Sequence, residues 1–126
     1  MADKTLAEYI LKTYGEAWVE QDTSKILSIF HTDGIYHEYI LKNPMVGHTE
    51  IAQYWQIKVV EEQSNIKFQL LNYYLCDNTI IAEWEALFDS NIKKCRFHIK
   101  QVAILEIKGT KIASLREYWH SEKSPL

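Results

Sequence analysis

The 126-residue sequence has no apolar run that approaches the roughly 18–20 residues needed to span a bilayer. Its basic residues never cluster beyond Lys93, Lys94 and Arg96, and its formal net charge is −3. A cationic surface for nucleic acid or anionic lipid is therefore not expected. The first residues include an acid, Asp3, and lack the apolar core of a signal peptide. We expect a cytoplasmic protein that binds neither nucleic acid nor membranes.

Cysteine is scarce, and the two that occur, Cys76 and Cys95, are far apart in the sequence. Without an export signal they are expected to be reduced thiols in the core rather than a disulfide. The five histidines show no metal-ligand spacing, and no H-E-x-x-H or C-x-x-C motif occurs. A nucleophilic-serine motif and a phosphate-binding glycine loop are also missing. We therefore expect neither a metal nor a cofactor.

What the sequence has in quantity is aromatic residues, with four Trp, eight Tyr and four Phe making up 13% of the chain. A chain of this length forms one domain and buries roughly two-thirds of its extended surface. Large rings fill such a core, and they also line pockets for flat apolar ligands. The composition alone does not show how many of these rings fill the core and how many line a pocket.

The first half of the chain has helical periodicity. Four apolar residues that recur every four positions predict a first amphipathic helix: Leu6, Ile10, Tyr14 and Trp18. Asp22 is expected to cap a short second helix that includes Phe30. A third helix is expected to present one apolar face, formed by Ile51, Tyr54, Trp55 and Val59.

From residue 66 the periodicity is that of strands, expected near 66–76, 79–89, 94–108 and 111–120 and separated by turn residues. A short first strand at 35–39 follows the turn signal Thr32-Asp33-Gly34. Consecutive strands with short links form an antiparallel meander, and the helices before it must lie across one face. We predict a single α+β domain over residues 1–126. Three N-terminal helices pack on a strongly curved antiparallel sheet, forming a cone with an internal pocket.

The sequence does not decide which face of the strand at 79–89 is buried. Simple periodicity buries one set of residues: Ile80, Ala82, Trp84, Ala86 and Phe88. The opposite set includes Glu83 and Glu85, which have the option of pairing across the sheet with Arg96 or His98. Both faces of the sheet can also be covered, one by the pocket and the other by a second copy of the chain. If both faces are covered in this way, we expect a homodimer that forms through the convex face, including Val102 and Ile104.

Four segments carry a resemblance to a known group of proteins: Tyr14–Phe30, His31–Tyr39, Pro44–Gly47 and Val102–Trp119. Together they resemble the nuclear-transport-factor-2-like superfamily, and within it the SnoaL-like (polyketide-cyclase-like) and ketosteroid-isomerase-like proteins. The resemblance spans nearly the whole chain and implies the cone fold. It leaves the activity open, because this superfamily hosts unrelated functions in one pocket.

The resemblance also implies roles for particular residues. Ketosteroid isomerases move a proton with a carboxylate base and hold the enolate with a tyrosine and a protonated aspartic acid. Tyr14 falls at the place of the tyrosine, and Glu38 at the place of the base. Two departures argue against a true steroid isomerase. The base is Glu instead of Asp, and the partner acid falls on or near Ala103, which has nothing to donate. The supporting tyrosine of the third helix falls on Trp55.

We therefore predict Tyr14 and Glu38 as catalytic residues; the alternative is a core tyrosine and a surface glutamate. The predicted ligand-binding residues are Trp18, Phe30, Trp55, Leu115, Glu117 and Trp119. The last three share a strand face, which points either into the pocket or, at Glu117, toward solvent at its rim. The expected function is a cofactor-independent isomerase, cyclase or dehydratase that transfers protons on a small apolar carbonyl compound. The alternative is a non-catalytic domain that binds a hydrophobic ligand or assembles with a partner.

Overall fold

The computed structural model describes residues 1–126. Helix α1 (Lys4–Val19) begins at Asp3, whose side chain accepts a 2.8 Å hydrogen bond from the Leu6 backbone nitrogen. Its predicted stripe, with Tyr14 and Trp18, is buried against the sheet, apart from a half-buried Leu6. No helix is long and apolar enough to cross a bilayer.

The second and third helices are shorter. Asp22 caps α2 (Thr23–Leu27), as predicted, by accepting a hydrogen bond from the Lys25 backbone nitrogen. The expected extension of this helix to Phe30 is wrong, because the chain turns after Ser28 and Phe30 begins the first strand. Helix α3 (Gly47–Tyr54) continues without a break into a π-helical segment, η1 (Trp55–Glu61). Such segments widen the helix and often occur beside functional sites.

Six strands form one sheet in the order β2-β1-β6-β5-β4-β3. Their bounds are β1 (Phe30–His37), β2 (Met45–Val46), β3 (Gln63–Cys76), β4 (Thr79–Ser90), β5 (Cys95–Lys108) and β6 (Lys111–Pro125). Strands β3 to β6 form the predicted antiparallel meander. The sheet as a whole is mixed, because β1 pairs with β6 in parallel. The predicted turn at Thr32–Gly34 lies inside β1, where the pairing with β6 shifts between Phe30 and Ile35.

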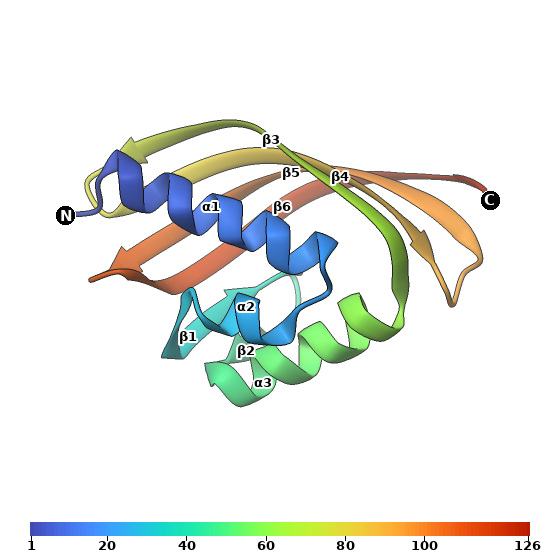
Figure 1. The fold of residues 1–126 in the computed structure, drawn as a ribbon, viewed down its shortest axis with the longest axis horizontal. Coiled ribbons are helices and arrows are strands. Elements are labelled where there is room, and N and C mark those ends of the chain that lie inside the picture. The colour runs from blue at the N-terminus through green and yellow to red at the C-terminus, as the bar shows by residue number, and fades with distance from the viewer.

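The sheet curves over α1, while α2, α3 and the short β1–β2 pair close the other side of the concave face (Figure 1). Close approach of α1 to β3 depends on Gly15. A Cβ atom at this position would lie 2.5 Å from the Phe68 ring, so no larger residue fits without a shift of that ring. The fold is therefore α+β, with three helices on a curved sheet as predicted.

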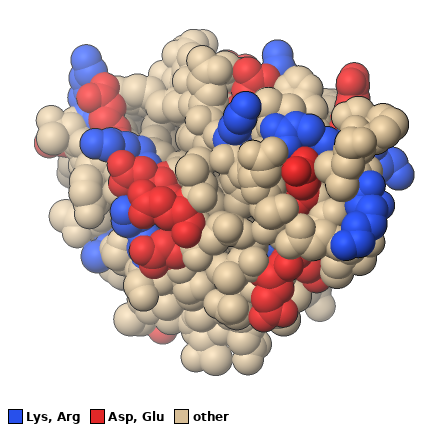
Figure 2. Space-filling view, turned by 45° about the vertical axis from the view of Figure 1, so that its right-hand side comes forward, with Lys and Arg blue, Asp and Glu red and all other residues tan.

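The orientation of β4 follows simple periodicity, since Ile80, Ala82, Trp84, Ala86 and Phe88 are all buried. Glu85 lies on the outer face and contacts His98 at 2.9 Å, which is one of the pairings considered above. Arg96 instead pairs with Asp89 at 2.8 Å. Acidic and basic side chains lie interspersed on the face that Figure 2 shows, without a patch of one sign.

Both cysteines are free, but neither lies in the core. Cys76 is exposed at the end of β3, and Cys95 is half-buried at the start of β5. The expectation of core thiols is therefore wrong, because both residues fall beside hairpin turns where the sheet meets solvent.

Candidate active site

A cavity of about 350 Å³ lies between the concave face of the sheet, α1 and the α3–η1 segment. Its walls are largely aromatic and include Tyr14, Trp18, Tyr36, Tyr54, Trp55, Phe88, Phe97 and Trp119. Three carboxyl groups, those of Glu38, Glu62 and Glu117, also line it. A cavity of this volume suits a small organic molecule, and its combination of aromatic rings with polar and charged groups is compatible with a ligand site.

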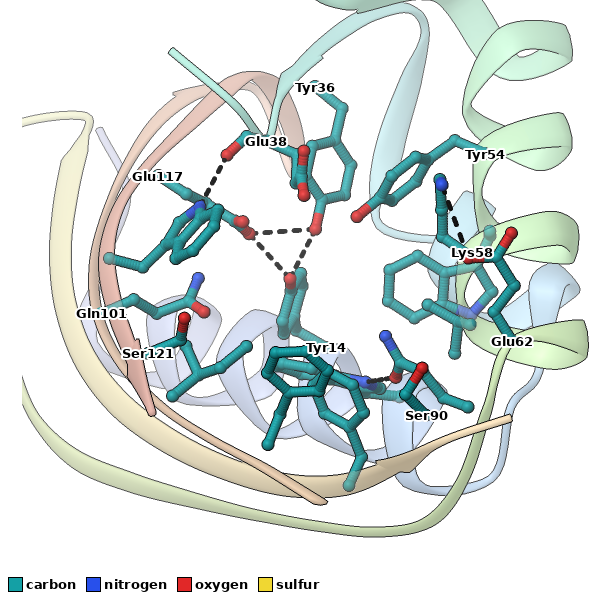
Figure 3. A pocket seen from close by; sticks show the side chains of 18 of the residues that line it. Tyr14, Tyr36, Glu38, Tyr54, Lys58, Glu62, Ser90, Gln101, Glu117 and Ser121 are labelled. Atoms are coloured by element: carbon teal, nitrogen blue, oxygen red, sulfur yellow. Dashed lines mark hydrogen bonds and ion pairs between the residues drawn. The ribbon is translucent and has the colours of Figure 1, made fainter. Parts of the chain in front are cut away.

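The centre of the site is a triangle of three oxygen atoms (Figure 3). The Tyr14 and Tyr36 hydroxyl oxygens lie 2.6 Å apart. Each also lies 2.9 Å from Oε2 of Glu117. The three residues come from α1, β1 and β6, and all three are buried. The triangle thus joins elements that are distant in the sequence at one point of the cavity wall.

Counting protons in this triangle indicates which form of Glu117 it favours. Two tyrosine hydroxyls carry two protons, whereas an ionised carboxylate has none to donate. With Glu117 ionised, one of the three short contacts would therefore hold no proton. A protonated carboxyl group supplies the third proton and completes the ring of hydrogen bonds. The geometry is thus most fully satisfied by neutral Glu117.

The electrostatic surroundings agree with a neutral carboxyl group. Burial raises the pKa of Glu117 from 4.5 to about 7, while the hydrogen bonds from Tyr14 and Tyr36 lower it. The negative charge of Glu38 raises this pKa further, and the amide of Gln101 lowers it. Burial also raises the pKa of each of the two tyrosines well above its usual value, so both remain protonated donors.

The second carboxyl group, Glu38, lies just beyond the end of β1 and is half-buried. Burial raises its pKa, but the positive charges of Lys58 and Lys42 and the hydroxyl of Tyr54 act in the opposite direction. The Trp119 indole nitrogen donates a 3.1 Å hydrogen bond to the Glu38 backbone oxygen, which ties this loop to β6. The two carboxyl groups therefore share one cavity but differ in surroundings, one among neutral donors and the other near cations.

Three buried donors lack a hydrogen-bond partner: Trp55 Nε1, Trp84 Nε1 and Gln101 Nε2. Leaving a buried donor unpaired costs about 1–3 kcal/mol, so such groups are rare in folded proteins. Trp55 and Gln101 both line the cavity, whereas Trp84 does not. By contrast, Trp18 Nε1 is satisfied at the cavity wall by a 2.7 Å hydrogen bond to Gln63 Oε1.

Most of the residues predicted from the sequence line this cavity: Tyr14, Trp18, Glu38, Trp55, Glu117 and Trp119. Glu117 is only 4% exposed, so it lies inside and not at a solvated rim. Phe30 and Leu115 do not reach the cavity. The Phe30 ring stacks behind Tyr36 at 5.5 Å, and Leu115 is completely buried in the core.

Among the cavity residues that were not identified from the sequence are Tyr36, Tyr54 and Gln101. A signal existed for Tyr36, because it stands two residues before Glu38 in the strand expected at 35–39, and alternate residues of a strand share one face. Tyr54 has its hydroxyl on the cavity side, facing Glu38 and Tyr36 (Figure 3). The neighbouring Trp55, to which the resemblance assigned a supporting tyrosine, instead packs its ring edge against Tyr14 at 6.0 Å.

The sequence also matches a family defined by other proteins: the model of the SnoaL-like domain aligns with residues 11–115. The chain belongs to the SnoaL-like domain family. Among curated proteins, none matches the sequence significantly.

Solved structures show the same nuclear-transport-factor-2-like fold at low sequence identity. A putative isomerase from Bacillus subtilis superposes with a TM-score of 0.81 at 15% identity, over 95% of this chain and 90% of that one. The epoxide hydrolase/cyclase-like enzyme SalBIII, described in pyran ring formation in salinomycin, also gives 0.81, at 18% identity over 95% of both chains. A ketosteroid-isomerase-like protein from Catenulispora acidiphila, in complex with trimethylamine, gives 0.77 at 18% identity, over 86% of this chain and 83% of that one.

Proposed function

We propose that this SnoaL-like protein is a cofactor-independent enzyme of the isomerase or cyclase kind, which transfers protons on a small, largely apolar carbonyl compound. The observation that carries the proposal is the different surroundings of two of the cavity's carboxyl groups, those of Glu38 and Glu117. Glu117 is held among neutral donors with a pKa of about 7, and Glu38 is held near two lysines. Such a pair suits an acid and a base acting on one substrate.

In the proposed reaction, Glu38 acts as the base and Glu117 as the acid. The Glu38 carboxylate removes a proton from the carbon next to the carbonyl group, while the Glu117 carboxyl group gives its proton to the carbonyl oxygen. The products are an enol, neutral Glu38 and ionised Glu117. Return of a proton to a different atom of the enol completes an isomerisation, and return of the remaining proton restores both carboxyl groups.

The tyrosines support this step without touching the substrate carbonyl. As Glu117 loses its proton, the hydroxyls of Tyr14 and Tyr36 both donate to its Oε2 atom, each at 2.9 Å. Hydrogen bonds to a developing negative charge stabilise the transition state more than the ground state. Tyr14 is therefore a positioning residue in this proposal, which differs from the direct donor role that the resemblance implies. The names of two structural neighbours, an isomerase and a cyclase-like enzyme, are compatible with this class of reaction.

The test is exchange of the C2 hydrogens of 1-indanone for deuterium in D₂O, followed by proton NMR. The native chain should accelerate exchange. Glu38→Gln and Glu117→Gln should each reduce the acceleration on the order of 10²-fold or more, because each removes one proton-transfer group. Glu62→Gln is the matched control, since Glu62 lines the same cavity beside Lys58. Binding of 1-indanone without any exchange would instead support the non-catalytic ligand-binding alternative.

We further propose that the protein is cytoplasmic and that two copies associate through the outer face of the sheet. This face carries partly exposed apolar side chains: Tyr74, Ile81, Val102, Ile104 and Tyr118. Apolar surface of this kind is commonly covered by association. Sedimentation at micromolar concentration should give a dimer, and Ile81→Glu should dissociate it. A native chain that sediments as a monomer would contradict this arrangement.

A further inference from the structure

The side chain of Gln101 brings an unused hydrogen-bond donor to the cavity wall. It stands on β5, is only 7% exposed and lines the cavity, yet its Nε2 atom has no partner. Nearly all buried polar groups in folded proteins are paired. A donor that is unpaired at the wall of a cavity is satisfied when a ligand with an acceptor atom binds there.

Gln101 also lies beside Glu117. In the β5–β6 ladder, Ala103 faces Glu117 and Gln101 faces Trp119, so Gln101 and Glu117 are diagonal neighbours on the concave face. Long side chains in that relation reach each other. Figure 3 shows both side chains entering the cavity from the same wall. The amide is also close enough to lower the pKa of Glu117, although no hydrogen bond joins the two groups.

We propose that Gln101 Nε2 and the neutral carboxyl group of Glu117, whose proton turns from the tyrosine ring toward the ligand, together bind the oxygen atom of a small ketone or aldehyde. A carbonyl oxygen has two lone pairs and no proton, so it accepts from both donors at once. With Glu117 neutral, the carboxylates of Glu38 and Glu62 are balanced by the ammonium groups of Lys58 and Lys93 in the cavity wall, which suits an uncharged ligand. The aromatic walls take the hydrocarbon part of the ligand. This inference rests on the proposed function and names the group that holds its substrate's oxygen. Gln101 supplies the donor that is missing at Ala103.

The test compares the affinities of 1-indanone and indane, which differ only by the carbonyl group, by NMR titration of the native chain and of Gln101→Met. Methionine keeps the length of the side chain and removes the donor. The native chain should bind 1-indanone more tightly. Gln101→Met should lower the ratio of the two affinities about 2- to 12-fold, the range for one hydrogen bond, and leave indane binding unchanged. Ser121→Ala, which removes a hydroxyl from the same cavity, should leave the ratio unchanged.

An unchanged ratio in Gln101→Met, an equal fall in Ser121→Ala, or no preference for 1-indanone in the native chain would each overturn the assignment. Gln101→Asn keeps the amide but shortens it by one methylene, and an intermediate ratio is expected; it also serves if the methionine variant fails to fold. Deuterium exchange separates this inference from the proposed function. If Gln101→Met lowers the affinity ratio but the native chain does not accelerate exchange, Gln101 is a carbonyl-binding residue in a non-catalytic pocket. If exchange depends on Glu117 but the affinity ratio is unchanged in Gln101→Met, the proposed enzymatic function stands and the role of Gln101 is rejected.

Discussion

The inner and outer faces of the curved sheet hold carboxyl groups in opposite surroundings. On the inner face, Glu117 is buried and its Oε2 atom lies 2.9 Å from the hydroxyl oxygens of two neutral tyrosines. On the outer face, Glu85 contacts His98 at 2.9 Å and Asp89 contacts Arg96 at 2.8 Å, and all four side chains remain partly exposed to solvent. The same type of side chain is therefore a neutral acid on one face and a member of an ion pair on the other.

The difference shows that the position of a carboxyl group in the sheet, more than its identity, decides whether it is available for proton transfer. Water and a nearby cation stabilise the charged form on the outer face, and such partly exposed pairs typically contribute about 0–1 kcal/mol to stability. On the inner face Glu117 is buried, so its ionisation is disfavoured and its pKa is raised to about 7.

The largest expected effect concerns the pH dependence of stability. Because the pKa of Glu117 is raised from 4.5 to about 7 in the folded state, the folded chain holds this proton more tightly than the unfolded chain does. The resulting stabilisation is fully present below about pH 4.5 and is lost as the pH rises through 7, a change of about 3 kcal/mol. In Glu117→Gln, the fall in the free energy of urea unfolding between pH 5 and pH 9 should be smaller by about this amount. Glu85→Gln should retain the native fall, and an equal fall in all three proteins would refute the assignment of the shift to Glu117.

A smaller effect is expected from the tyrosines. Their hydrogen bonds lower the pKa of Glu117, so Tyr36→Phe should raise that pKa above its native value of about 7. Removing the hydroxyl should also reduce the unfolding free energy by about 1–2 kcal/mol at pH 5, since it breaks a buried hydrogen-bonded network. The pKa is measured from the carboxyl ¹³C shift of Glu117, with Tyr39→Phe as a control outside the triangle. A pKa that stays constant or falls would mean that Tyr36 is not a donor to Glu117.

The smallest effect is expected on the outer face. Glu85→Gln removes the carboxylate next to His98, yet both side chains are partly solvated. The unfolding free energy at pH 6 should therefore change by less than about 1 kcal/mol, and 0.5 M NaCl should reduce the difference further. Urea denaturation with and without salt measures it. A loss as large as that in Tyr36→Phe would remove the contrast between the two faces.

Local signals in the sequence account for much of the fold. The ends of β3, β4, β5 and β6 fall within a few residues of the predicted ones, because turn residues separate long alternating runs. The parallel pairing of β1 with β6 was not predicted, since the two strands are about 80 residues apart and neither carries a local signal for its partner. The sequence predicts a turn at Thr32–Gly34, because only local preferences are visible in it and these residues favour turns. In the structure, pairing with a distant strand keeps them in a bulged strand instead.

The candidate site shows the same contrast between features with a local signal in the sequence and contacts between distant elements. Tyr14 and Glu38 were identified through a resemblance and a helical stripe, and both line the cavity. Their roles remain proposals. The contacts among Tyr14, Tyr36 and Glu117 depend on three elements meeting at one point, which no spacing along the chain encodes. The unpaired amide of Gln101 was not predicted either, because the residues that lie next to it on β6 are known only once the register between β5 and β6 is known.

That register bears on how such a pocket can change its chemistry over evolution. The resemblance places a proton-donating acid on or near Ala103, and in this chain Ala103 stands directly opposite Glu117 in the β5–β6 ladder. A carboxyl group on either strand therefore enters the cavity at the same level. A carboxyl group that moved from one of these two positions to the other would stay at the same place in the cavity, although a comparison of single sequence positions would count it as lost.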